Sequence, residues 1–269
     1  MSQENQPIDT TTAEAYERHM VPGMFAHWTE LVVGLVPPQP TDHVLDIACG
    51  TGIGVRVASR FVGSTGKVVG VDIDPGVIEV ARRLTQATGI PMEWHCADAL
   101  QVPFKDATFD LCFCLQGLQF FPDRHAGLAE IRRILKPSGR LAASIWGPLE
   151  YNMGHYAVVQ ALESQGVDAS AAKRACSFSN PDDIRDAATR AGFSRMQLHT
   201  EDGVSHFTSI KSFIDGMTQG SPSTRHAVAL LLESGRDEFF EQVSMMLEPH
   251  VTSGELRYPM RTHVLVAQP

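Results

Sequence analysis

The sequence predicts a doubly wound α/β fold: a mostly parallel, seven-stranded sheet with an N-terminal helical lid and a helical insertion before the last strand. Between residues 43 and 146, short apolar runs alternate with helical stretches, which is the pattern of sheets built from right-handed crossovers. These runs are apolar on both faces, as expected where helices cover both sides of a parallel sheet. A glycine-rich turn follows the first run.

The composition narrows the class of protein before any motif is considered. The chain has 269 residues, of which 43% are hydrophobic and 20% charged, the usual balance of a globular protein. Acidic residues outnumber basic ones by 31 to 22, which argues against a general nucleic-acid-binding protein. The apolar runs are too short to span a bilayer, and the polar start lacks the apolar core of a signal peptide. We therefore expect a cytoplasmic protein.

The first helical pattern lies at residues 11–36. Apolar residues recur there every three or four positions, with an interruption at Val21-Pro22-Gly23. We expect two short helices separated by a kink, the second ending before Pro37-Pro38. These helices define the predicted lid, residues 1–38.

Five strands and three helices are expected in the next part of the chain. The strands are predicted at Val44–Cys49, Val68–Ile73, Met92–Ala97, Phe109–Gln116 and Leu141–Trp146. The helices are predicted at Gly54–Phe61, Pro75–Thr88 and Arg124–Leu135. After Trp146 we expect helices near residues 153–165, 181–191 and 209–248, and strands at 196–200 and 262–267. The predicted division is therefore lid 1–38, α/β core 39–208, helical insertion 209–250, and final core strand 251–269.

The segment from Val44 to Gly54 carries the most chemical information. It places Asp46 inside a strand that leads to Gly50 and Gly52, and then to a helix. Such turns let a ligand approach the backbone, and the helix N-terminus favours an anionic group. A dinucleotide fingerprint would need a third glycine where Val55 stands. The carboxylate favours a ligand with a positive amino group instead.

Two more acids follow the next two predicted strands. Asp72 ends the second strand, where a carboxylate can accept hydrogen bonds from both ribose hydroxyls. Asp98 ends the third strand, where it could accept from an adenine amino group. Helix or turn capping is the alternative role for each acid. Three acids at three successive strand ends favour a nucleotide that carries an amino acid.

With these motifs, the chain resembles the class I S-adenosylmethionine-dependent methyltransferases, in the group that includes the ubiquinone/menaquinone C-methyltransferases. The matching stretches are VLDIACGTG at 44–52, VGVDID at 69–74, ADALQVPF at 97–104, FDLCFCL at 109–115 and EIRRILKPSGRL at 130–141. The resemblance covers residues 40–147 and specifies the cofactor better than the substrate. Ser138 stands where many relatives have glycine.

The resemblance implies S-adenosyl-L-methionine as cofactor, with S-adenosyl-L-homocysteine as product. It implies cofactor-binding roles for Tyr16, Asp46, Ala48, Gly50, Gly52, Asp72, Ile73, Asp98, Ala99 and Gln116. The residues of the glycine turn would hold the methionine end of the cofactor. Asp72 and Ile73 would hold the ribose, and Asp98 and Ala99 would hold the adenine. Gln116 would face the methionine moiety, and Tyr16 lies in the helix that closes over the cofactor in relatives.

Candidates for chemistry on the acceptor are fewer. His155 and Tyr151 are four residues apart, which would place them on one helical face as acid/base groups. Phe25 and Trp146 are candidate acceptor-binding residues because aromatic groups are common in the segments expected to roof the site. No metal site is predicted, since Cys112 and Cys114 lack further ligands at suitable spacing.

The leading hypothesis is therefore in-line methyl transfer to an oxygen, nitrogen or carbon of a small, apolar or aromatic metabolite. A non-catalytic S-adenosylmethionine-binding protein is one alternative, and a nicotinamide-dependent oxidoreductase is another. A protein acceptor stays open because a fold does not fix the acceptor. As partners we expect the small-molecule acceptor, no nucleic acid and no membrane span, with a homodimer as a further possibility.

Overall fold

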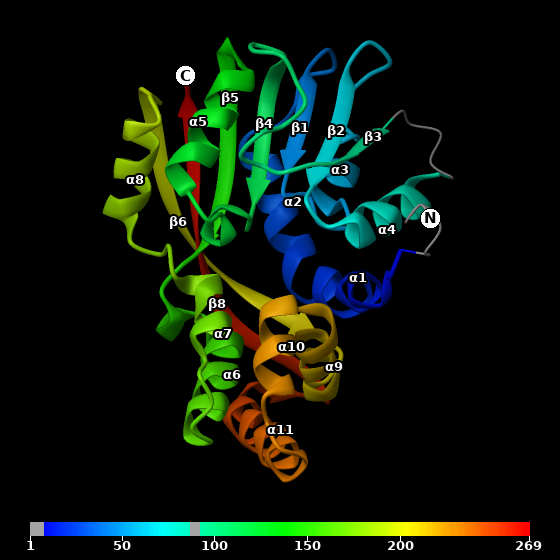
Figure 1. Cartoon of the computed structure of the whole chain (residues 1–269), viewed down its shortest axis with the longest axis vertical. Coiled ribbons are helices and arrows are strands. Elements are labelled where there is room, and N and C mark those ends of the chain that lie inside the picture. The colour runs from blue at the N-terminus through cyan, green and yellow to red at the C-terminus, as the bar shows by residue number, and fades with distance from the viewer. Residues whose placement is uncertain (1–7, 87–91) are drawn as a thin grey trace, which may run out of the picture.

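A computed structural model describes residues 8–86 and 92–269 of the chain. One sheet runs through it in the order β3-β2-β1-β4-β5-β8-β6 (Figure 1), with the short β7 paired to β8. The pairs among β1 to β5 are parallel, whereas β8 runs antiparallel to both β5 and β6. The strands are β1 His43–Ile47, β2 Lys67–Asp72, β3 Met92–Cys96, β4 Phe109–Leu115, β5 Leu135–Trp146, β6 Arg195–Phe207, β7 Val251–Thr252 and β8 Glu255–Gln268. The predicted seven-stranded α/β sheet is confirmed, with β7 as a two-residue addition.

The helices that pack against this sheet include α3 Ile53–Ala58, α4 Pro75–Thr85, α5 Arg124–Ile134 and α8 Pro181–Arg190. Three of them begin at a side-chain cap, because Asp74, Asp123 and Asn180 each accept a hydrogen bond from a backbone N–H of the first turn. The strands and helices bury apolar residues on both faces of the sheet. Residues 87 and 88, where the predicted helix 75–88 was to end, lie outside the described residues.

The N-terminal segment differs from its prediction. It forms α1 Thr11–Ala15, a π-helical stretch at Tyr16–Phe25 and α2 Ala26–Leu35, without a break between them. Instead of two short helices, the chain forms one continuous helical run, and Pro22 lies inside its π-helical stretch. The second helix does end before the two prolines, as predicted.

The second half of the chain builds a helical lobe below the sheet (Figure 1). Its helices are α6 Met153–Ser164, α7 Ser170–Lys173, α9 Ile210–Asp215, the π-helical stretch Gly216–Gly220, α10 Pro222–Ala229 and α11 Glu233–Leu247. Single 3₁₀ turns lie at Leu118–Phe120, Leu149–Tyr151, Arg174–Cys176 and Glu248–His250. The lobe is larger than the predicted insertion at 209–250, because α6 and α7 also pack with it.

The two last long strands connect the sheet to this lobe. β8 pairs with β5 only at residues 262–267, whereas β6 and β8 pair with each other down to Phe207 and Leu256. The strands predicted at 196–200 and 262–267 are therefore much too short. The free part of the ribbon stacks Phe207 and Tyr258 against Phe213 of α9.

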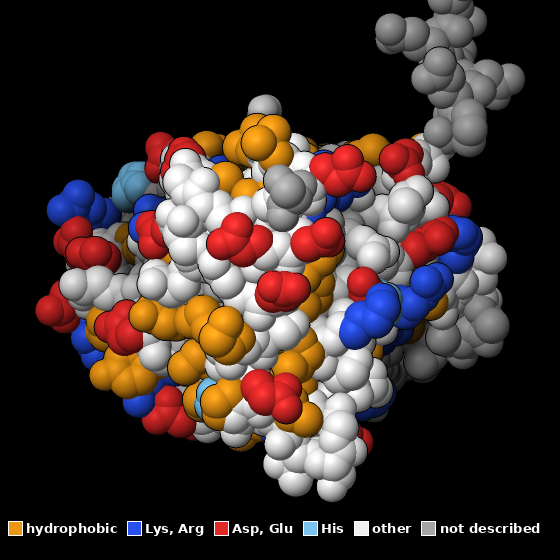
Figure 2. Space-filling model, turned by 90° about the horizontal axis from the view of Figure 1, so that it is seen from below, with side chains coloured by type: hydrophobic (Ala, Val, Ile, Leu, Met, Phe, Trp, Pro, Cys, Tyr) orange, Lys and Arg blue, Asp and Glu red, His pale blue; other side chains and the backbone are white. Residues whose placement is uncertain are grey.

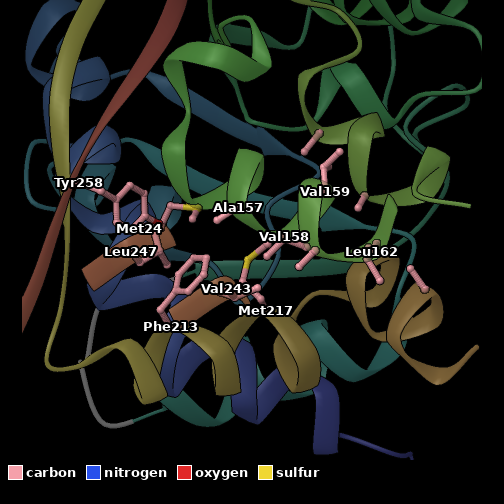
Figure 3. Packing of buried hydrophobic residues seen from close by; sticks show 14 of the residues in the cluster. Met24, Ala157, Val158, Val159, Leu162, Phe213, Met217, Val243, Leu247 and Tyr258 are labelled. Atoms are coloured by element: carbon pink, nitrogen blue, oxygen red, sulfur yellow. The ribbon is translucent and has the colours of Figure 1, made fainter. Parts of the chain in front are cut away.

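The helical lobe has a hydrophobic core of its own, shown in Figure 3. Met24 enters it from the N-terminal segment and lies near Tyr258, Phe213 and Leu247. The N-terminal segment is thereby fixed between the sheet and the lobe. On the face of the molecule seen from below, hydrophobic side chains are exposed among acidic ones (Figure 2). None of the helices among the described residues is both long and apolar enough to cross a membrane.

Candidate cofactor and acceptor site

A cavity of about 760 Å³ lies between the carboxyl ends of β1, β2, β3 and β4 and the helical lobe. Open α/β sheets bind their ligands at this edge. On the sheet side, the wall includes Ala48, Gly50, Asp72, Ile73, Asp74, Asp98, Ala99 and Gln116. On the other side it includes Tyr16, Met20, Phe25, Trp146, His155, Arg174, Met217 and His226. Eight of the ten predicted cofactor-binding residues therefore line one cavity.

The glycine turn after β1 is as tight as its sequence suggests. Gly50 and Gly52 have φ angles of +53° and +83°, which residues with a side chain rarely adopt. A Cβ at Gly52 would lie 2.2 Å from the Trp94 ring. A Cβ at Gly54 would lie 2.2 Å from Oδ2 of Asp46, so the first turn of α3 packs directly on this carboxyl. The turn exposes its backbone to the cavity at Gly50.

Asp46 and Gly52 were expected at the methionine end of the cofactor, but neither lines the cavity. Asp46 is 2% exposed, and its Oδ1 has no hydrogen-bond partner among the described residues. Burial, with a smaller contribution from the charge of Asp72, raises the pKa of Asp46 to about 8. Asp46 lies behind the turn, and Gly52 belongs to the turn but packs against Trp94 and away from the cavity.

Asp72 and Asp98 lie at the cavity, as the sequence predicts. Oδ2 of Asp72 accepts a hydrogen bond from the Gly50 N–H at 2.9 Å, and Oδ1 accepts one from the Asp74 N–H at 3.0 Å. Oδ1 of Asp98 accepts from the Leu100 N–H at 2.9 Å. Each acid therefore caps a turn and also faces the cavity. Capping, the alternative role for these acids, is thus compatible with a position at the ligand site. Burial raises the pKa of Asp72.

Gln116 meets the cavity at the end of β4 in a strained conformation, with a φ angle of +59°. Its side-chain amide is already engaged: Nε2 donates to Oγ1 of Thr262 at 3.0 Å, and Oε1 accepts from Gln119 at 3.1 Å. This favours the backbone of Gln116 as the group presented to a ligand. Ala48 at the end of β1 has a similar φ angle of +57°.

An aromatic wall closes the cavity opposite the acids. The ring of Tyr16 lies 5.1 Å from that of Phe25, and Phe25 lies 6.0 Å from Trp146. His155 continues the row at 6.1 Å from Trp146. Tyr16 also lies nearest to the position that a Cβ of Gly50 would occupy, at 3.7 Å. The wall thus leads from the glycine turn to α6.

The structure separates the two candidate acid/base residues. His155 lies in α6, is 6% exposed and lines the cavity. Tyr151 ends the preceding 3₁₀ turn, is 46% exposed and does not line the cavity. Asn152 separates the two elements, so the shared helical face expected for these residues does not form. The Tyr151 ring instead lies under the Arg261 guanidinium, 3.8 Å from the ring centre.

Sequence reasoning missed much of the wall from the helical lobe. Met20, Arg174 and His226 line the cavity without having been assigned to it. Met20 belonged to the predicted lid, so its helical pattern could have indicated it. The others come from short elements far along the chain, with no motif around them. No group of three or more metal-ligating side chains is found in the described part of the chain.

Comparison with known proteins bears on the α/β region. Residues 45–143 match the methyltransferase domain family. The chain is 34% identical over 122 residues to the 2-phytyl-1,4-naphtoquinone methyltransferase of Synechococcus elongatus, covering 45% of this chain and 52% of that one. It is 34% identical over 132 residues to the ubiquinone/menaquinone biosynthesis C-methyltransferase of Cupriavidus taiwanensis, covering 48% and 54%. The chain thus matches only about half the length of these curated relatives.

Solved structures resemble the chain over a longer stretch. A putative methyltransferase from Bacillus halodurans has a TM-score of 0.61 at 19% identity, covering 89% of this chain and 97% of that one. Phosphoethanolamine N-methyltransferase 2 of Haemonchus contortus, in complex with S-adenosyl-L-methionine, has a TM-score of 0.61 at 18% identity, covering 97% and 57%. The (4+2) cyclase SpnF has a TM-score of 0.58 at 17% identity, covering 99% of both chains. These similarities show a shared fold that includes the helical lobe.

Proposed function

We propose that the protein transfers the methyl group of S-adenosyl-L-methionine to a small, apolar or aromatic acceptor. One observation carries this proposal: within a methyltransferase fold, Gly50, Asp72 and Asp98 line one side of a cavity whose other side is aromatic. The polar nucleotide would thus contact the acidic side of the cavity, and the apolar acceptor would contact the aromatic side. The sulfonium methyl group is itself a strong electrophile, so the protein's task is chiefly to align the acceptor with it.

The residues at the sheet edge fit S-adenosyl-L-methionine. Each carboxylate oxygen of Asp72 already accepts one backbone hydrogen bond, but an oxygen has two lone pairs and can also accept from a ribose hydroxyl. Oδ2 of Asp98 makes no hydrogen bond within the described residues and is available to an adenine amino group. At Gly50, the absence of a side chain leaves room for the ligand beside Tyr16.

The acceptor class follows from the opposite wall. Phe25, Trp146, Met20 and Met217 offer apolar surface, and the carboxylates of the cavity all come from the sheet edge. An apolar or aromatic acceptor loses little on leaving water for such a wall, whereas a charged group would lose its hydration. Two curated relatives carry quinones in their names, which supports an aromatic ring system here.

Two other functions can be weighed on the same site. A non-catalytic S-adenosylmethionine-binding protein would keep the acids and the glycine turn, so turnover must be measured directly. The structural similarity to the (4+2) cyclase SpnF covers 99% of both chains, and that name describes a reaction other than methyl transfer. Turnover must therefore be measured, because the fold alone does not determine the reaction. A nicotinamide enzyme is disfavoured by Val55 at the third glycine position. Homodimer formation stays a prediction.

Calorimetric titration with S-adenosyl-L-methionine, S-adenosyl-L-homocysteine and NAD tests the cofactor. We expect micromolar binding of the first two, none of NAD, and about tenfold weaker binding in Asp98→Ala, which loses a charge-assisted hydrogen bond. Asp186→Ala is the matched control, because this exposed acid lies on α8, away from the cavity, and pairs with Arg190. Release of S-adenosyl-L-homocysteine with an acceptor panel then tests turnover. Absence of sulfonium binding would refute the proposal.

A further inference from the structure

His155 is a buried polar side chain whose hydrogen-bonding capacity the protein leaves unused. It is 6% exposed, it lines the cavity, and neither of its ring nitrogens has a hydrogen-bond partner among the described residues; Nδ1 is fully enclosed, so Nε2 is the ring nitrogen that a ligand can reach. A buried nitrogen without a partner costs free energy, because it has given up its hydrogen bonds to water. Buried polar groups in native proteins nearly always have partners, so an exception that faces a cavity indicates a ligand.

The position of His155 identifies which ligand this would be. The aromatic wall begins with Tyr16 beside Gly50 and continues through Phe25 and Trp146 to His155. His155 therefore lies at the end of the wall remote from the glycine turn, on a helix of the lobe. This is the acceptor end of the site under the proposed function, on which the present inference rests.

The surroundings of His155 keep its ring neutral. Of the described residues that line the cavity, those from the helical lobe include no carboxylate, and Arg174 is a cation among them. Asp72, Asp74 and Asp98 come from the opposite, sheet side. Burial lowers the pKa of His155 to about 4. A neutral imidazole donates from one ring nitrogen and accepts at the other, so it can pair with a hydroxyl group.

We propose that the methyl acceptor is a neutral hydroxylated aromatic compound and that His155 accepts the hydrogen bond of its hydroxyl group and then its proton. The acceptor oxygen attacks the methyl carbon, the carbon–sulfur bond breaks and its electron pair stays on sulfur. The hydroxyl proton passes to the free ring nitrogen of His155 and then to solvent. The products are an aryl methyl ether, a thioether and one proton.

A weakly basic histidine suffices for this step. A neutral phenol loses its proton easily only as the new carbon–oxygen bond forms, because the oxygen then becomes positively charged and strongly acidic. The base must be uncharged and in place at that moment, and His155 meets both conditions. The rings of the aromatic wall themselves offer no counter-charge to an ionised group, and the Arg174 cation lies elsewhere on the lobe side of the cavity.

Binding of 2-naphthol tests the inference without requiring turnover. With the protein saturated with S-adenosyl-L-homocysteine, we expect 2-naphthol to bind about five- to tenfold more tightly than naphthalene, as one hydrogen bond would give. Excited 2-naphthol is a strong acid, so a base in contact with its hydroxyl group produces naphtholate emission. The bound probe should show this emission in the wild-type protein.

Three variants separate the roles of this side chain. His155→Phe should lose both the preference and the naphtholate emission, while His155→Asn should keep the preference, through its amide oxygen, and lose the emission. His199→Phe should keep both, because His199 is exposed on β6 and does not line the cavity. Equal binding of the two probes to wild-type protein, or unchanged emission in His155→Phe and His155→Asn, would overturn the inference. Intact S-adenosyl-L-homocysteine binding in the same samples would leave the proposed function standing.

Discussion

Glu17 and Arg56 form an ion pair at 2.8 Å that joins the N-terminal π-helical stretch to the first helix after the glycine turn. The second oxygen of Glu17 accepts a hydrogen bond from the Thr51 hydroxyl at 2.5 Å, and Arg56 donates to the Thr51 carbonyl at 2.7 Å. Both charged side chains are largely buried, at 22% and 19% exposure. The pair thereby fixes the segment that carries Tyr16 against the turn at Gly50.

Glu17→Gln should weaken the binding of S-adenosyl-L-homocysteine without removing a group that lines the cavity. The ion pair and the hydroxyl hydrogen bond together order the turn, and losing the charge should cost about 1–1.5 kcal/mol, or about five- to tenfold in affinity. Calorimetric titration measures this effect. Glu30→Gln is the control: Glu30 pairs with Arg60 nearby, but both side chains are half exposed. Equal affinities in the two variants would show that the pair does not support the site.

Gly54 should tolerate no side chain, although its φ angle is not positive. The clash of an added Cβ with Asp46 would move the carboxyl or the helix, so we expect Gly54→Ala to lower the free energy of unfolding by about 1–3 kcal/mol. Gly34→Ala is the matched control, since nothing lies within 4 Å of a Cβ there and α2 should gain up to about 1 kcal/mol. Urea unfolding of both variants would reveal the opposite signs, and a stable Gly54→Ala would refute the clash.

The sequence could predict the sheet side of the site because local chemistry determines it. Asp72 and Asp98 follow buried strands, and parallel strands bring their carboxyl ends to one edge whatever the loops between them. Asp46 shows the limit of this reasoning. It has the expected position along β1, yet alternation along the strand and the packing of Gly54 place its carboxyl behind the turn.

The helical side could be predicted only in outline. Met217 and Arg174 reach the cavity because β6 and β8 extend past the sheet as a ribbon and carry the lobe beneath it. The lengths of β6 and β8 could not be predicted from the sequence, because polar residues interrupt the apolar pattern in the outer parts of both strands. The separation of Tyr151 from His155 depends on one residue, Asn152, whose amide Nδ2 donates to the Gly147 and Pro148 carbonyls.

Phe25 should contribute to acceptor binding and not to cofactor binding. Its ring lies between those of Tyr16 and Trp146 in the aromatic wall. We expect Phe25→Ala to weaken 2-naphthol binding about tenfold through lost contact area and ring packing, with S-adenosyl-L-homocysteine affinity changed less than threefold. Phe240→Ala is the control, because Phe240 packs in the lobe and does not line the cavity. A larger effect on the cofactor product would place Phe25 at the wrong end of the site.

Asp46 should make stability fall with rising pH. Its pKa is about 8 in the folded protein and about 4 when the chain is unfolded. Between these values the folded state holds a proton that the unfolded state has lost, so the free energy of unfolding decreases across this window. Asp46→Asn cannot ionise, and its stability relative to wild type should rise by a few kcal/mol from about pH 5 to about pH 8. Urea unfolding across this range measures the gap in the free energy of unfolding between the variant and the wild type. Titrating groups that both proteins share contribute about equally to each and largely cancel from this gap. A gap that stays constant with pH would mean that Asp46 is already ionised at neutral pH in the folded protein.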